Sequence, residues 1–303
     1  MKLKKSYRYS KRILSILLLF LFFKIFSQRI SVENKHIYPL EIRYKNQVLK
    51  LGKGEKKVFA DKEIDFLNIE FDNGRKIISK DIPILLNPNE SLNINVLNSI
   101  DQTLEFKGDK APLHNLVINQ QHYILYKNIG NYQDILSKNT NTQQLISYFE
   151  FVLADYLTKI KTLNASPTGT EDKIYRRAEK YAINDWVASL YLILTGQKTL
   201  DLQKKELILY YYNKYIKKDF PNYHCGYKVQ YNIIRDLIPY THQLNINFPE
   251  YSVIENTDED RIIQHLPESC QRFYFKNNYN YFYEINSPKK EYYKGVLKEK
   301  FNN

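Results

Sequence analysis

Hydrophobic and polar residues alternate along the chain from about residue 29 to residue 108, which is the period of a β-strand with one buried face. Residues that favour turns interrupt this alternation at short intervals, and an Asn-Gly pair is typical of a tight hairpin. The expected strands lie within residues 41–51, 67–71, 77–78, 82–86, 92–96 and 104–106, with turns at Gly52-Lys53-Gly54, Asn73-Gly74 and Asn87-Pro88-Asn89. Short strands separated by turns predict an antiparallel β-sandwich over residues 29–108.

After Gly108 the hydrophobic residues recur every three or four positions, which predicts helices. The clearest run extends over residues 145–160, and Pro112 suits a first helical turn. Further helices are expected over residues 170–195, 201–218 and about 229–237, and after Ser287-Pro288. The absence of a fixed internal repeat disfavours a solenoid. The sequence therefore predicts an α+β protein, with an all-α helical domain of six or seven helices over residues 109–303.

The first 28 residues predict export from the cytoplasm. A basic stretch precedes an apolar run of eleven residues, 13–23, which is shorter than the ~20 residues that span a bilayer. This arrangement is typical of a secretory signal peptide. Ser27 suits the position before the cleavage site, whereas Lys24 and Ile25 do not, so an uncleaved N-terminal anchor is the alternative. We expect the protein in the periplasm or cell envelope, touching the membrane transiently through the signal peptide or through a retained anchor.

The net charge of +12 resides mainly in the same N-terminal segment. Residues 1–28 hold seven Lys and Arg and no acidic residue, so the rest of the chain has 38 basic and 33 acidic residues. A nucleic-acid-binding protein needs clustered cations to neutralise phosphates, and here the remaining lysines are scattered among acids. The charge pattern therefore predicts no nucleic-acid partner.

The two cysteines, Cys225 and Cys270, would meet an oxidising environment in an exported protein. A disulfide between them would close a loop of about 46 residues and contribute ~4 kcal/mol to stability in the chain-entropy model. The alternative is two free buried thiols, because cysteine often serves as a small apolar residue. The chain contains no CxxC pair, so local sequence predicts no redox-active dithiol.

No recognisable catalytic or cofactor-binding motif occurs in the sequence. The best candidates for a metal site are His224 and Cys225, followed by His242, the acidic run 258–260 and His265. Adjacent side chains diverge on a regular element, and the acidic run also suits a helix start. There is no GxSxG nucleophile elbow, and the segment 52–57 lacks the spacing of a phosphate-binding loop and suits a solvated turn. We predict no metal, no cofactor and no catalytic residue.

Aromatic residues are concentrated in the helical half, in the segments 210–212, 273–275 and 279–283. Consecutive aromatics on a helix cannot all face the core, so some are expected at the surface, where they suit recognition of a peptide, glycan or protein. The candidate binding surface consists of Tyr210, Tyr211, Tyr274 and Tyr281. The alternative is that tyrosine is abundant for compositional reasons and lies at the boundary of the core.

The junction of the two halves carries a distinctive order of turn and strand residues. It comprises the turn in residues 86–91, the alternating Leu92, Ile94 and Val96, the segment 104–108, Ala111 and Asn115. Over roughly residues 60–125 this order resembles the N-terminal region of exported TlpA-like thiol-disulfide oxidoreductases of Bacteroidetes. Asn89 stands where that family usually has glycine, and asparagine also adopts left-handed backbone geometry.

The resemblance implies a stand-alone relative of the non-catalytic region of these proteins. The family continues into a thioredoxin domain with a Trp-Cys-x-x-Cys site, whereas here Trp186 is followed by Val187 and the redox pair is missing. We therefore predict an exported, non-catalytic binding or accessory protein whose partner is an envelope protein or peptide, bound at the sheet–helix junction or on the aromatic surface. The alternatives are a vestigial paralogue, or an enzyme built from dispersed residues such as His224, His242 and His265.

Overall fold

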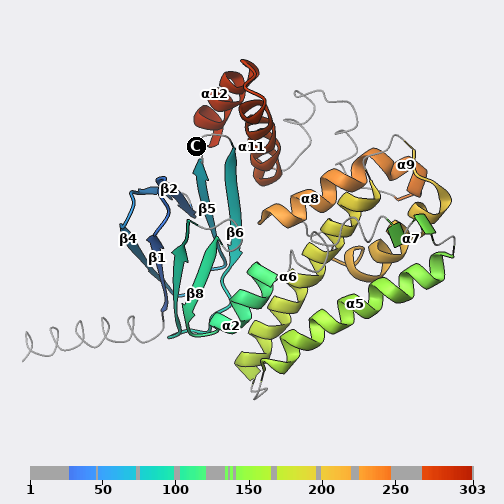
Figure 1. The fold of residues 1–303 in the computed structure, drawn as a ribbon, viewed down its shortest axis with the longest axis horizontal. Helices are drawn as coiled ribbons and strands as arrows, with labels where there is room; N and C mark the ends of the chain where they lie inside the picture. The colour runs from blue at the N-terminus through green and yellow to red at the C-terminus, as the bar shows by residue number, and fades with distance from the viewer. Residues whose placement is uncertain are drawn as a thin grey trace, which may run out of the picture.

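A computed structural model shows a β-sandwich followed by helices, which is the predicted α+β class (Figure 1). It describes residues 27–45, 47–72, 76–98, 103–120, 134–135, 137–138, 141–164, 169–195, 199–219, 225–246 and 268–301. The apolar run of the predicted signal peptide lies outside the described residues, as does the Asn73-Gly74 turn.

The strands of the described residues form two four-stranded sheets that enclose an apolar core. They are β1 (Gln28–Asn34), β2 (Leu40–Tyr44), β3 (Gln47–Leu51), β4 (Lys56–Asp61), β5 (Phe66–Asp72), β6 (Ile77–Pro83), β7 (Ser91–Val96) and β8 (Leu104–Gly108). The strand orders are β4-β1-β7-β8 and β3-β2-β5-β6. Inward-facing residues such as Ile30, Ile42 and Ile94 are completely buried, as the alternation predicts.

One pair of strands departs from the predicted antiparallel arrangement. β1 runs parallel to β7, with Ile30 beside Leu92 and Val32 beside Ile94. Parallel neighbours need a crossover connection, and here the chain visits the second sheet between them. The alternation of side chains does not depend on strand direction, so the sequence pattern did not reveal this pair.

The segment 41–51 is a hairpin, β2–β3, rather than one strand. The chain reverses after Tyr44 through Lys45, whose φ is 53°, and Ile42 then pairs with Leu49. Val48 continues the spacing of Ile42 along the sequence, which makes the alternation look unbroken. In the structure Val48 faces outward and is 39% exposed, while Leu49 is partly buried against the core.

Two turn positions at the junction need unusual backbone geometry. Gly108 has a φ of +105°, and a Cβ there would lie 2.7 Å from the carbonyl oxygen of Ser91. Asn89 has a φ of 75°, the left-handed geometry expected of it from the sequence. Gly108 allows the end of β8 to approach the start of β7 closely, and Asn89 allows the turn that leads into β7.

The four helical runs predicted with bounds, 145–160, 170–195, 201–218 and 229–237, each coincide with helices of the structure, which also has helices whose bounds were not predicted. The helices of the described residues are α2 (Ala111–His114) with the π-helical turn η1 (Asn115–Gln120), α5 (Thr142–Thr162), α6 (Gly169–Leu194), α7 (Leu202–Tyr211) with π-helical η2 (Tyr212–Ile216), α8 (Lys228–Leu237), η4 (Ile238–Tyr240), α9 (Thr241–Leu244), α11 (Glu268–Glu284) and α12 (Lys289–Phe301). The side chains of Asn141 and Asp201 cap α5 and α7 by accepting backbone N–H bonds. Within the described ranges, no helix has the length and apolar character needed to cross a membrane.

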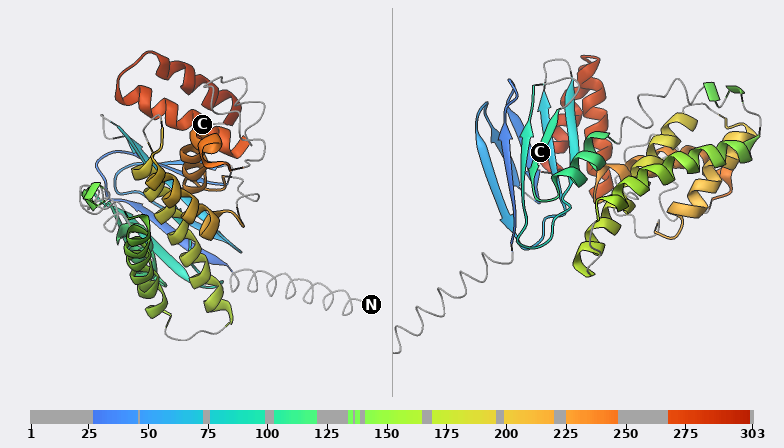
Figure 2. Two further views of the ribbon diagram at one scale, coloured as in Figure 1. Left: turned by 90° about the vertical axis from the view of Figure 1, so that its right-hand side faces the viewer. Right: turned by 60° about the horizontal axis from the view of Figure 1, so that its bottom comes forward.

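The last two helices form a hairpin, α11–α12, that lies against the sandwich and apart from α5 and α7 (Figures 1 and 2). Phe275, Tyr293 and Leu297 give this hairpin a small apolar core of its own. Cys270 and Phe273, at the start of α11, belong instead to the main core. The part of the chain after residue 108 therefore supplies one group of helices beside the sandwich and a second, separate hairpin on it.

A desolvated charge pair lies where the sandwich meets α6. Asp185 of α6 is only partly exposed, and burial raises the pKa of its carboxyl to about 7. Lys80 of β6 opposes this shift by electrostatic attraction, while burial lowers the pKa of Lys80 itself. Aromatic contacts surround the pair, with Phe66 stacked on Tyr227 at a centroid distance of 4.7 Å.

His114 fastens α2 to the sandwich and is completely buried. Its Nε2 accepts from the backbone N–H of Leu85 at 3.0 Å, and its Nδ1 lies 2.8 Å from the carbonyl oxygen of Lys110. This pattern requires a neutral ring that is protonated on Nδ1. Burial lowers the pKa of His114 to about 4, below its ordinary value of 6.5.

We expect His114 to make the fold sensitive to acid. The unfolded chain binds the proton more tightly, so stability is lost as the pH falls from 6.5 toward 4, by up to ~3 kcal/mol. Urea unfolding of the wild-type protein and of a His114→Gln variant at a series of pH values measures this loss. At neutral pH the variant should have a lower free energy of unfolding than the wild type, but it should lose less of it as the pH falls to 4. If the free energies of the two proteins fall in parallel with pH, His114 is not the group responsible.

Candidate functional site

The candidate site lies between the α11–α12 hairpin and the outer face of the β3-β2-β5-β6 sheet. Three adjoining cavities occupy this interface, and Arg43 of β2 lines all three. The innermost has a volume of about 20 Å³, and the two more open clefts have volumes of about 390 Å³ and 530 Å³. Arg43 is therefore the centre of the site.

Basic side chains outnumber acidic ones around these cavities by eight to four. The basic residues are Arg43, Lys45, Lys50, Lys228, Arg272, Lys276, Lys294 and Lys300, and the acidic residues are Glu41, Glu70, Asp72 and Glu268. They come from the strands, the start of α8 and the hairpin, so the fold gathers cations that the sequence scatters. A cleft lined by an excess of one charge attracts ligands of the opposite charge.

A network of paired charges forms the floor of the site. The side chains of Arg43 and Glu70 are 9% and 8% exposed, and Arg43 Nε lies 3.9 Å from Glu70 Oε2. Lys276 of α11 approaches the same oxygen at 2.7 Å, and Arg43 also pairs with Glu41. Glu70 thus holds one cation from the sheet and one from the hairpin, which fixes the position of both.

Arg272 of α11 differs from Arg43 and Lys276 because it forms no direct ion pair with a carboxylate in the part of the chain that the structure describes. It borders both the inner cavity and the larger cleft. Among the described residues its guanidinium forms no hydrogen bond or ion pair, and its contact is with the ring of Phe273 at 5.0 Å. Burial lowers the pKa of Arg272, the charges of Asp81 and Glu70 oppose this shift, and the neighbouring Arg43 adds to it. A desolvated guanidinium that no carboxylate contacts directly is prepared to bind an anion.

Asn68 of β5 and Asn280 of α11 both line the inner cavity. The Oδ1 atom of each is buried and has no hydrogen-bond partner among the residues that the structure describes. The Nδ2 of Asn68 donates to Asp81 Oδ1 at 2.6 Å, and the other oxygen of Asp81 accepts from the backbone N–H of Lys228 at 2.7 Å. Asp81 therefore connects the sheet to the start of α8 beside the site.

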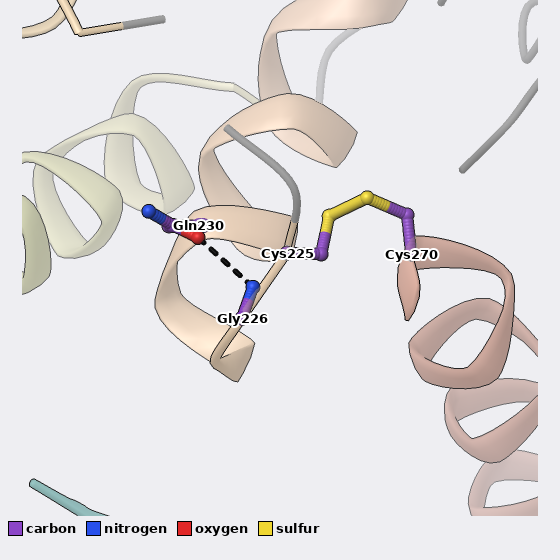
Figure 3. The surroundings of a disulfide bond; sticks show 4 residues. All are labelled: Cys225, Gly226, Gln230 and Cys270. Atoms are coloured by element: carbon purple, nitrogen blue, oxygen red, sulfur yellow. Dashed lines mark hydrogen bonds between the residues drawn. A yellow bond between two sulfur atoms is a disulfide. The ribbon is translucent and has the colours of Figure 1, made fainter. Parts of the chain in front are cut away.

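The disulfide between Cys225 and Cys270 borders the larger cleft and joins the segment before α8 to the start of α11 (Figure 3). Both cysteines are buried. The backbone N–H of Gly226 donates to Gln230 Oε1 at 3.0 Å, which stabilises the turn that carries Cys225. Of the two possibilities left open by the sequence, the structure contains the disulfide, so neither sulfur is a free thiol.

The four tyrosines predicted as a binding surface do not lie together. Tyr211 is completely buried in the main core, so its assignment to a surface was wrong: it occupies the inward side of α7. Tyr210 of α7 is partly buried and accepts from Lys214 Nζ at 3.0 Å. Tyr274 and Tyr281 belong to α11, where Tyr274 packs against the cores and Tyr281 is 57% exposed. The separation of α7 from α11 is visible in Figure 1.

The histidines named for a metal or enzyme site are not brought together by the described part of the chain. His242 lies exposed on α9, while His224, His265 and the acidic run 258–260 lie outside the described residues. No group of three potential metal ligands occurs among the residues that the structure describes. The enzyme alternative built on these histidines stays a prediction.

The sequence analysis did not identify Arg43, Arg272 or Lys276. Each is an isolated basic residue without a motif, and Arg43 and Arg272 lie more than 200 positions apart in the sequence. One signal was available for Arg43, because it occupies an outward position of an alternating strand where a charge is ordinary. An outward position predicts that the side chain of Arg43 is exposed, and it does not indicate that a helical hairpin covers this face of the sheet.

No protein-family model matches the chain, and no curated protein is significantly similar to it.

Proposed function

We propose that the protein is a non-catalytic binding protein of the cell envelope that takes an acidic ligand in the basic cleft between the sheet and the α11–α12 hairpin. The observation that carries this proposal is Arg272, a desolvated guanidinium at the boundary of two cavities that forms no direct ion pair or hydrogen bond in the described chain. Arg43 and Lys300 line the same cleft.

The chemistry of the lining favours binding over reaction. Guanidinium groups stay protonated at physiological pH, so they hold anions in place and do not transfer protons. The sulfurs of Cys225 and Cys270 are joined in the disulfide, which removes them as nucleophiles in the oxidised protein. A ligand that presents carboxylates, such as an acidic segment of an envelope protein or peptide, matches this set of donors.

Export and family relationship are parts of the same proposal. The basic and apolar segment before Gln28 supports a signal peptide or anchor, and a disulfide suits an oxidising compartment. The resemblance to the non-redox region of TlpA-like proteins supports an accessory role without thiol chemistry.

Reversing the charge of Arg272 should weaken binding of an acidic probe. With a fluorescein-labelled hexaglutamate peptide, we expect Arg272→Glu to raise Kd at least tenfold, because a hydrogen bond between charged groups contributes ~1.5–3 kcal/mol. Fluorescence anisotropy measures Kd, and added salt should weaken binding by the wild-type protein. The matched control is Lys218→Glu, an exposed site on the other helical group, which should leave Kd within twofold.

A second substitution separates ligand binding from a structural role. Arg272→Met removes a desolvated charge, so it should raise the free energy of unfolding by ~1 kcal/mol while still weakening hexaglutamate binding. If Arg272 serves only the fold, this variant loses stability. Failure of the wild-type protein to bind hexaglutamate in low salt would contradict the proposed function itself.

A further inference from the structure

β3 presents a backbone edge with free hydrogen-bonding capacity. It is the end strand of its sheet and pairs with β2 alone. Within the described chain its outer edge takes no backbone hydrogen bond, and the carbonyl of Leu51 accepts from the side chain of Asn34 at 3.0 Å. Edge strands of this kind are templates for the addition of another strand.

Two open clefts over the outer face of the sheet reach from this edge strand to α12. Gln47 and Val48 share the larger cleft with Lys300 and Phe301. At the other end, Lys50 shares the second cleft with Lys294 and Leu297. As the numbering of β3 rises, that of α12 falls, so strand and helix run in opposite directions along the site.

The lengths of the two walls agree with a continuous groove. Three strand steps from residue 47 to residue 50 cover ~10 Å, at about 3.4 Å per residue. Seven helical steps from residue 294 to residue 301 cover ~10.5 Å, at 1.5 Å per residue. A groove of this length between an edge strand and a helix accommodates a short extended peptide.

The charges of the groove select the side chains of such a peptide. Val48 and Lys50 face outward from the sheet together with Arg43, and α12 contributes Lys294 and Lys300 from the opposite wall. In an added strand, every second side chain would point to this basic side. Carboxylates at alternate positions would therefore meet these cations, while the intervening side chains would face the rim of the sandwich.

We infer that an extended peptide segment of about five residues, with acidic side chains at alternate positions, binds between β3 and α12 as a fifth strand of the β3-β2-β5-β6 sheet. This inference rests on the proposed function and specifies its ligand. Backbone hydrogen bonds to β3 supply affinity, and the alternate carboxylates set the register against Lys50 of β3 and against Lys294 and Lys300 of α12.

The test uses the full chain and four labelled peptides. The parent is Val-Glu-Val-Glu-Val. Two peptides have the same sequence with N-methyl groups on alternate backbone nitrogens, one for each register toward β3, and the fourth has its two Glu residues adjacent. N-methylation leaves charge unchanged but removes the N–H donors, so we expect Kd to rise at least tenfold in one register. The peptide with adjacent Glu residues should bind at least fivefold more weakly than the parent.

Hydrogen exchange locates the bound peptide on the protein. Saturating parent peptide should slow amide exchange in residues 47–51 and leave the β4 edge strand unchanged. Equal binding of parent and N-methylated peptides, or no protection of β3, would overturn strand addition while hexaglutamate binding through Arg272 still stands. Binding of an anionic polysaccharide such as polygalacturonate, with no binding of the parent peptide, would overturn the peptide assignment.

Discussion

Replacing both Cys225 and Cys270 by serine is expected to lower the free energy of unfolding by ~4 kcal/mol. The disulfide joins residues 45 positions apart, and in the chain-entropy model a loop of that size stabilises the fold by limiting the unfolded ensemble. The α11–α12 hairpin has a small core of its own and meets the sheet through polar groups, so we expect it to separate first.

Urea unfolding monitored by circular dichroism tests this expectation. The oxidised wild-type protein should unfold at a higher urea concentration than the double serine variant. Dithiothreitol should shift the wild-type midpoint toward that of the variant and leave the variant unchanged. Equal midpoints for the oxidised and reduced wild-type protein would show that the bond does not support the fold.

The second large effect is expected at the junction of β6 and α6, where Asp185→Asn should stabilise the protein at pH 8. The pKa of Asp185 is raised from 3.8 to about 7, so the folded state binds its proton more tightly than the unfolded state does. The folded protein therefore loses stability as the pH rises from about 4 through 7. The full shift corresponds to about 4 kcal/mol, and because the residue is partly exposed we expect a gain of ~3 kcal/mol.

The gain should depend on pH, which distinguishes it from an ordinary packing change. At pH 4 the carboxyl is protonated in the folded protein, so the variant and the wild type should differ by less than ~1 kcal/mol. Asp155→Asn, an exposed site on α5 paired with Lys159, is the matched control and should change stability by ~0.5 kcal/mol or less at either pH. A gain of equal size at both pH values would contradict a charge-based cause.

The order of strands and helices could be predicted because hydrophobic spacing reports which side of an element is buried. The run from Leu145 to Ile160 placed α5 correctly, and Ser287-Pro288 marked the start of α12. The reversal at Lys45 was missed because Val48 is hydrophobic at an outward position. The direction of β1 relative to β7 was missed because parallel and antiparallel strands share the same alternation.

The candidate site could not be predicted, because its parts are distant in sequence and chemically ordinary. Tyr283 of α11 donates to Asp72 of β5 across 211 positions, and neither residue belongs to a motif. The hairpin covers a polar sheet face, so the usual sign of an interface, exposed hydrophobic residues on the strand, is missing. The run of three tyrosines led to the prediction that Tyr211 lies at the surface, whereas its ring packs in the main core.

For a chain that is exported and cleaved beside Ser27, as we propose, the central place of β1 sets the order of events. β1 lies between β4 and β7, and Gln28 at its start is buried, donating to the carbonyl of Leu86 at 2.6 Å and accepting from the N–H of Ile64 at 2.7 Å. A processing enzyme that cuts beside Ser27 needs this segment extended and accessible. In an exported chain, cleavage must therefore precede completion of the sandwich, and β1 must wait for some sixty further residues to emerge before its parallel neighbour is available.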